Sequence, residues 1–118
     1  MLWALIAFAP APALAQDPVT VDSAHYRVVF ENEQVRVLRI TYGPNERSVM
    51  HSHPASVAVL LTDARQQFTL PNGQTVRDSG RAGDARWADA GSHLPQNLAN
   101  RRFEGVLIEL KARPSGTT

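Results

Sequence analysis

Residues 43–57 read Gly43-Pro-Asn-Glu-Arg-Ser-Val-Met-His51-Ser-His53-Pro-Ala-Ser-Val57. Gly43-Pro44-Asn45 is a turn signal, and the chain is expected to be extended from Val49 to His53, until Pro54 interrupts the strand. Because side chains alternate between the two faces of a strand, His51 and His53 point the same way. The stretch therefore predicts a strand that directs two imidazoles at one point.

The chain on both sides of this stretch reads as short strands separated by turns. The run Val57-Ala-Val-Leu-Leu61 is almost continuously apolar, which is typical of a strand covered on both faces, and Asn72-Gly73 is a hairpin signal. No stretch keeps a helical period of useful length. Strands are predicted at residues 26–30, 35–42, 49–53, 57–61, 67–70, 74–76, 85–88 and 103–110, and a turn is predicted to open at Gly91. Short strands with a turn about every 8 to 12 residues indicate an all-β sandwich or barrel.

Length and composition exclude several classes of protein. The 118 residues are enough for one domain, and 43% apolar with 19% charged residues is an ordinary globular balance. A formal charge of +1 gives no electrostatic reason to expect a nucleic acid or an anionic membrane as partner. Cysteine is absent, which excludes disulfide scaffolds, thiolate metal sites and cysteine nucleophiles. A metal would have to be held by imidazole, carboxylate or backbone oxygen.

The first fifteen residues read as a secretory leader. An apolar run at residues 2–9 is followed by Pro10, Pro12 and the A-x-A pattern Ala13-Leu14-Ala15. The run is shorter than the ~20 residues that span a bilayer, so we expect a signal peptide over residues 1–15, no membrane span, and a secreted or periplasmic protein. No Lys or Arg precedes the run, and a buried N-terminal helix is the alternative interpretation. The expected remainder is an extension over 16–24, a barrel over 25–111 and a flexible tail over 112–118.

Three of the four histidines are candidate metal ligands. Imidazole is a common ligand of borderline metal ions, and a neighbouring strand could bring His93 alongside His51 and His53. The H-x-H pair by itself is weak support, because hydrogen-bonded or solvated histidines are more usual than ligands. His25 has no companion at useful spacing and is interpreted as a surface or structural histidine.

Two stretches resemble the motifs of the cupin superfamily. The first family motif runs from a glycine through H-x-H to a glutamate, and residues 43–57 match it up to the glutamate. The second runs from a glycine through a proline–glycine turn to a histidine and an asparagine, here Gly83-Asp-Ala-Arg-Trp87-Ala-Asp-Ala-Gly91-Ser-His93-Leu-Pro-Gln-Asn97. The resemblance covers roughly residues 25–111 and is closest to small single-domain bacterial cupins. It implies an all-β double-stranded β-helix, the jelly-roll barrel of the cupins.

The chain departs from the family pattern at two points. Val57 or Ala58 stands where the family has its glutamate ligand, and Asp89 replaces the usual proline of the second motif. Some cupins, similar to thiol dioxygenases, use three histidines without a carboxylate. The resemblance then implies a divalent metal, whether iron, manganese, nickel or zinc, held by the three ligands His51, His53 and His93. Without the anionic ligand the ion would be held less tightly, would keep a higher net charge and would have a further open position.

Two functions remain open from the sequence. The first is a metalloenzyme, dioxygenase-like or a lyase or isomerase, that acts on a small organic molecule. The second is a metal or small-ligand binding module without catalysis, which the missing glutamate favours somewhat. The resemblance also implies a homodimer.

A few neighbouring residues are candidates for lining the site. Phe68 and Trp87 are expected to line or cap the apolar part of the barrel. Asn97 either supports the site or fixes a turn, and Gln67 faces either the cavity or water. Arg86 and Arg39 could each offer a guanidinium to a carboxylate, but both are expected on the surface.

Overall fold

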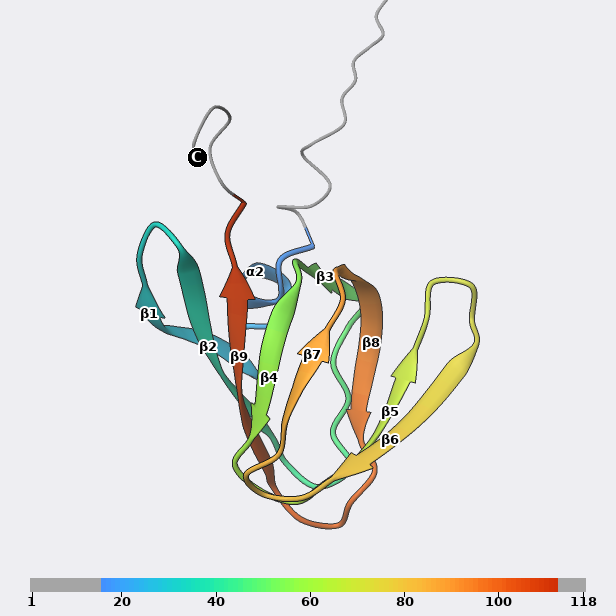
Figure 1. The fold of residues 1–118 in the computed structure, drawn as a ribbon. Helices are drawn as coiled ribbons and strands as arrows, with labels where there is room; N and C mark the ends of the chain where they lie inside the picture. Colours follow the sequence, from blue (N-terminus) through green and yellow to red (C-terminus); the bar gives the residue numbers. More distant parts are fainter. Residues whose placement is uncertain (1–15, 113–118) are drawn as a thin grey trace, which may run out of the picture.

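The computed structural model describes residues 16–112 (Figure 1). The predicted leader and residues 113–118 of the predicted tail lie outside the described residues. Within residues 16–112 the chain forms one short helix and nine strands. They are α2 (Pro18–Val21), β1 (Tyr26–Glu31), β2 (Val35–Tyr42), β3 (His51–His53), β4 (Ser56–Leu60), β5 (Ala64–Thr69), β6 (Thr75–Gly80), β7 (Ala85–Ala88), β8 (Gly91–Asn97) and β9 (Phe103–Leu110).

The strands form two antiparallel sheets. The five-stranded sheet has the order β1-β2-β9-β4-β7, and the four-stranded sheet has the order β3-β8-β5-β6. Figure 1 shows the two sheets leaning towards each other, with β9 and β4 on one side and β8 and β5 on the other. The all-β prediction is confirmed.

The core lies between the sheets. In β9, buried and partly exposed residues alternate along the strand, which is the period expected when one face is covered. The neighbouring strand β2 contributes Leu38, which is fully buried. The core cluster consists of Tyr26, Leu38, Tyr42, Leu60, Ala64, Phe103 and Leu107.

The predicted turn at Gly91 is wrong, because residues 91–97 form strand β8. The stretch has few β-branched residues and contains Pro95, which cannot donate to a sheet. However, the carbonyl of Pro95 accepts from the backbone N–H of Ser48 at 2.9 Å, so its missing N–H faces that irregular segment and not β5. By contrast, three of the predicted strands have the observed bounds. They are 35–42, 85–88 and 103–110, which correspond to β2, β7 and β9.

The N-terminal residues are tied to both sheets. Asp17 caps α2 by accepting from the backbone N–H of Val19, and it also accepts from the Arg36 guanidinium at 2.8 Å. The backbone N–H and the hydroxyl of Ser52 in β3 both donate to Gln16, at 2.9 Å each. Among the described residues no helix is long and apolar enough to cross a membrane.

Candidate metal and ligand site

Strands β3 and β8 bring three histidines together. His51 pairs directly with His93 across the two strands, and His53 pairs with Gly91. The His93 ring centroid lies 5.1 Å from that of His51 and 4.7 Å from that of His53. His51 and His53 are 1% and 9% exposed, so neither ring faces bulk solvent. The three imidazoles that the sequence singled out therefore lie side by side on the inner face of one sheet.

Hydrogen bonds orient two of the three rings. His51 Nδ1 donates to the carbonyl of Val49 at 2.9 Å, and His53 Nδ1 donates to the carbonyl of Pro54 at 3.0 Å. Because a carbonyl can only accept, each bond places the proton of the neutral ring on Nδ1 and leaves Nε2 with a free lone pair. The third ring, His93, stacks on Phe68 with centroids 5.0 Å apart.

Burial keeps two of the rings uncharged near neutral pH. It lowers the pKa of His51 to about 4. It also lowers the pKa of His93 to about 3, with a smaller contribution from repulsion by the neighbouring His53 and His51. Neutral imidazole is the form that binds a metal ion.

The donor chemistry fits a borderline divalent cation better than the geometry does. Imidazole nitrogens are suitable donors for iron, manganese, nickel or zinc. Within residues 16–112, however, no three His, Cys, Asp or Glu side chains are grouped so that they could hold a metal ion as they stand. Binding would therefore have to draw the rings closer together.

A cavity of about 570 Å³ adjoins the three histidines. Its wall is mostly apolar and comes from both sheets. The main apolar side chains are Ile40, Leu60, Phe68, Leu70, Val76, Phe103 and Leu107. A volume of this size is typical of a small-molecule site.

The charged residues of the cavity wall already have partners. Arg86 donates to Asp78 at 2.5 Å and also lies 3.6 Å from Asp84. Asp89 accepts from the Trp87 indole N–H at 2.8 Å. Of the two arginines that the sequence suggested as carboxylate ligands, Arg86 is thus paired within the chain, and Arg39 is paired with Glu104.

The structure separates the remaining candidates. Phe68 lines the cavity, as does Gln66, whereas Gln67 accepts from Arg77 at 3.4 Å. Trp87 borders the cavity, but its side chain is 56% exposed. Asn97 is fully buried away from the histidines and fixes a loop, because its amide donates to the carbonyls of Gly43 and Arg101, at 2.9 and 2.8 Å.

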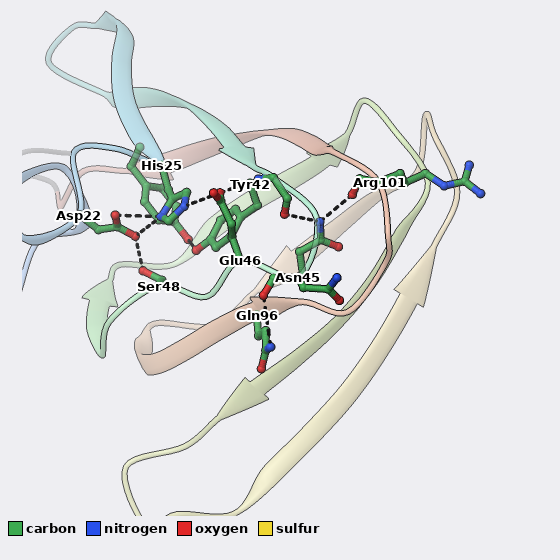
Figure 2. A network of polar contacts seen from close by, with 11 residues as sticks. Asp22, His25, Tyr42, Asn45, Glu46, Ser48, Gln96 and Arg101 are labelled. Atoms are coloured by element: carbon green, nitrogen blue, oxygen red, sulfur yellow. Dashed lines mark hydrogen bonds and ion pairs between the residues drawn. The ribbon is translucent and has the colours of Figure 1, made fainter.

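A polar network behind His51 was not predicted from the sequence. Ser48 donates to Asp22 (Figure 2). The Ser48 hydroxyl also lies 3.3 Å from His51 Nδ1. Asp22 accepts from His25 Nδ1 at 2.8 Å, and Glu46 accepts from His25 Nε2 at 3.0 Å (Figure 2). The short spacing between Asp22 and His25 is visible in the sequence, but the contacts to Glu46 and Ser48 are made only by the fold.

His25 has a structural place in this network. Its ring stacks on Tyr42 with centroids 4.3 Å apart and an interplanar angle of 5°. Burial alone lowers the pKa of His25, but the hydrogen bonds to Asp22 and Glu46 outweigh burial and hold that pKa above its usual value. The ring therefore favours the imidazolium form, which a metal ligand cannot use.

Solved structures share this architecture. The chain is similar to a cupin domain protein of Bordetella pertussis, with 27% identity and a TM-score of 0.69 over 74% of this chain and 92% of that chain. It is also similar to an RmlC-like cupin of Methanocaldococcus jannaschii with a double-stranded β-helix fold, at 14% identity and a TM-score of 0.58 over 72% and 77% of the two chains. The chain has the cupin fold. No family model and no curated protein matches it.

A characterised enzyme is among the structures similar to this cupin. The oxalate decarboxylase of Lactobacillus farciminis, solved with formate, matches with 23% identity and a TM-score of 0.53. The match covers 71% of this cupin and 25% of the decarboxylase chain, so it supports the fold alone.

The cupin glutamate has no replacement in β4. Val57 pairs with Ile108 and Trp87 on the outer face of the five-stranded sheet, so its side chain points away from the histidines. Ala58 packs against the core and has no donor atom. Neither of these two positions in β4 therefore supplies a carboxylate beside the histidines.

Proposed function

We propose that this cupin binds a small organic molecule in its barrel cavity, beside a divalent metal ion held by His51, His53 and His93. The observation that carries the proposal is the meeting of three imidazoles from two strands at the wall of an apolar cavity. Burying three such rings together is costly unless their nitrogens have partners, and a cation would supply one partner for all three.

The residues present would have different roles in such a site. His51 and His53 would present Nε2, because their Nδ1 atoms are committed to backbone carbonyls. His93, held against Phe68, would complete the set from the opposite strand. The apolar wall would exclude water and position the organic molecule. When bound, the metal would supply Lewis acidity and a template for that molecule.

A non-catalytic binding module is the second candidate. The three rings are not assembled as a ligand set, and the cavity carboxylates Asp78 and Asp89 already accept from Arg86 and Trp87. No free carboxylate of the described cavity wall is placed to act as a general base. These observations favour binding without turnover.

The deciding experiment measures metal binding by isothermal titration calorimetry and metal content by mass spectrometry. His51→Ala, His53→Ala and His93→Ala should each weaken binding of zinc, iron, manganese or nickel by more than about 100-fold, since losing only an outer hydrogen-bond partner costs about 10- to 100-fold. His25→Ala is the matched control and should bind normally. Full metal occupancy in the three variants would refute the proposal.

A second experiment distinguishes the two candidates. An oxidase or dioxygenase would consume oxygen in a substrate-dependent single turnover of the iron-loaded protein, whereas a binding module would not. Lyase and isomerase activities are assayed by product analysis with the same loaded protein.

We also propose that the protein works in the periplasm or outside the cell, on the strength of the predicted leader. N-terminal sequencing of protein recovered from that compartment should begin at Gln16. A chain that still begins at Met1 would contradict cleavage.

A further inference from the structure

The outer face of the four-stranded sheet carries a polar row with an arginine at each end. Arg47 lies opposite Gln96 in an isolated bridge, and Gln96 lies opposite Gln67. Gln67 in turn lies opposite Arg77 of the edge strand β6. Directly opposed residues in antiparallel strands share a face, so these four side chains form one row. Arg65 joins the same face, because it precedes Gln67 by two residues in β5.

This row points to solvent and not to the cavity. Gln66 and Phe68, the neighbours of Gln67 in β5, both line the cavity. Because adjacent side chains in a strand alternate between faces, Gln67 and its row are on the outside of the barrel. All three arginines are exposed. Their guanidinium groups are therefore accessible to a ligand in solution.

Hydrogen bonds hold two of the arginines beside a hollow in this face. Arg65 Nη2 donates to the carbonyl of Leu98 at 3.2 Å, and Arg77 Nε donates to Gln67 Oε1 at 3.4 Å. A guanidinium has five N–H donors, so most of them stay available to an acceptor. A groove of about 350 Å³ lies beside the two side chains, with Ser79 in its wall. Arg65 and Arg77 are diagonal neighbours in the register, about 7–8 Å apart, so both can reach one ligand.

The charge on this face is of one sign. Apart from the arginines, the outward positions of β3, β8, β5 and β6 carry glutamine, serine, threonine and Leu94, and none of them is acidic. Asp78, which lines the cavity and also borders the groove, accepts from Arg86 at 2.5 Å. Within residues 16–112, none of the three arginines has a carboxylate within ion-pair distance. The formal charge of +1 for the whole chain therefore conceals a local excess of positive charge.

We propose that this face binds an acidic polysaccharide, with sugar carboxylates against the three arginines and sugar hydroxyls against the two glutamines. Three strand spacings of about 4.8 Å place the backbones of Arg47 and Arg77 about 14 Å apart, with both glutamines between them. A ligand that repeats its negative charge along its length fits this spacing. The planar guanidinium fork matches a carboxylate in a bidentate pair. The glutamine amides can donate and accept, as a hydroxyl also can.

The composition of the face favours a polysaccharide over other polyanions. Single-stranded nucleic acid is bound by aromatic side chains that stack on its bases, and the outward positions of these four strands have none. A protein interface depends on buried aromatic and apolar anchors, whereas Leu94 is the one apolar residue at these outward positions. An acidic sugar chain needs ion pairs and hydrogen bonds from a polar surface. The histidines point to the other side of this sheet, so the inference is independent of the proposed metal site.

Isothermal titration calorimetry of the full chain with polygalacturonate at low ionic strength tests the proposal. Wild type should bind polygalacturonate and not neutral dextran. Arg47→Gln, Arg65→Gln and Arg77→Gln should each weaken binding by about 3- to 10-fold, and the triple variant should not bind. Arg27→Gln is the matched control, since Arg27 is an exposed arginine of the other sheet and its loss changes the net charge equally. Circular dichroism checks that each variant is folded.

The control variant distinguishes a local site from general charge attraction. An equal loss of affinity in Arg27→Gln would show that net charge alone attracts the polymer, and would refute the site. Wild type that does not bind, or binding that the three substitutions leave unchanged, would also refute it. Oligothymidylate is the competing polyanion, and tighter binding of this probe through the same arginines would overturn the assignment to a polysaccharide.

Discussion

The hydroxyl oxygens of Tyr26 and Tyr42 lie 2.6 Å apart inside the core. The two residues are 5% and 1% exposed, and burial raises the pKa of both phenols, so each stays protonated. Tyr42 stacks on His25, whereas Tyr26 meets the edge of His51 with ring centroids 5.0 Å apart. The pair therefore joins the structural histidine of the network to the inner histidine of the candidate site.

Removing one hydroxyl of this pair should be more harmful than removing both. Tyr42→Phe leaves the buried Tyr26 hydroxyl without its partner and should lower the free energy of unfolding by about 1–3 kcal/mol. The double variant Tyr26→Phe/Tyr42→Phe leaves no unpaired group and should lose less than the sum of the single variants. Urea denaturation of the four proteins measures this coupling. Strict additivity would show that the hydrogen bond contributes nothing.

His25 should make stability depend on pH in the neutral range. Its pKa in the folded protein is raised above the 6.5 of the unfolded chain, so its contribution is fully present below pH 6.5. The contribution is lost as the pH rises through the raised folded pKa. The difference in unfolding free energy between wild type and His25→Gln should therefore be larger at about pH 5.5 than at about pH 9.

The difference between the two proteins is the quantity to measure. His51 and His93 have lowered pKa values and act in the opposite direction, since their contributions are lost as the pH falls. Both rings are present in wild type and in His25→Gln, so their effects cancel in the comparison. A difference that stays constant with pH would contradict a charged His25.

Substitution of Asn97 should lower the stability of the fold far more than substitution of its neighbour Gln96. Asn97→Ala leaves the carbonyls of Gly43 and Arg101 and the backbone N–H of Ala99 without their partner, and should cost about 2–4 kcal/mol. Gln96 makes only a long bond of 3.4 Å to the carbonyl of Asn45, so Gln96→Ala should cost less than about 1 kcal/mol. Thermal unfolding compares the two variants, and equal losses would contradict the assigned loop-fixing role.

Two ion pairs of similar length should differ in their contribution to stability. Glu109 is almost buried and accepts from Arg36 at 2.8 Å, so Arg36→Met leaves an uncompensated carboxylate and should cost about 2–4 kcal/mol. Lys111 lies 2.6 Å from Glu31, but their side chains are 36% and 46% exposed, and Lys111→Met should cost less than about 1 kcal/mol. Denaturant unfolding measures both costs. A small loss of unfolding free energy in Arg36→Met would mean that Glu109 takes up a proton or finds another partner.

The sequence predicts local features of this fold better than contacts between distant segments. Val35 to Tyr42 and Phe103 to Leu110 have strong β-strand composition, and both strands have the predicted bounds. The i, i+2 spacing of His51 and His53 also fixes their common face without any knowledge of the fold. The stretch from Gly91 to Asn97 has weak strand composition, so the sequence predicts only a turn that opens at Gly91. The segment is extended because it pairs with the two flanking strands.

The contacts around the candidate site join residues that are far apart in the sequence. No short sequence pattern therefore predicts these contacts. Ser48 reaches Asp22 across 26 residues, and the His51–His93 pair depends on the register between β3 and β8. The run Val57-Ala-Val-Leu-Leu61 predicts a strand covered on both faces, yet within the described residues only its inner face meets the core.

The strand that carries His51 and His53 has only three residues and lies at the border of its sheet. One side of β3 is secured by β8, and the other side is fastened through Ser52 to Gln16. Removal of Gln16 would therefore break both bonds to the edge strand β3, and the side chains of His51 and His53 would be held less firmly. The contacts of Gln16 thus help to anchor two of the three rings.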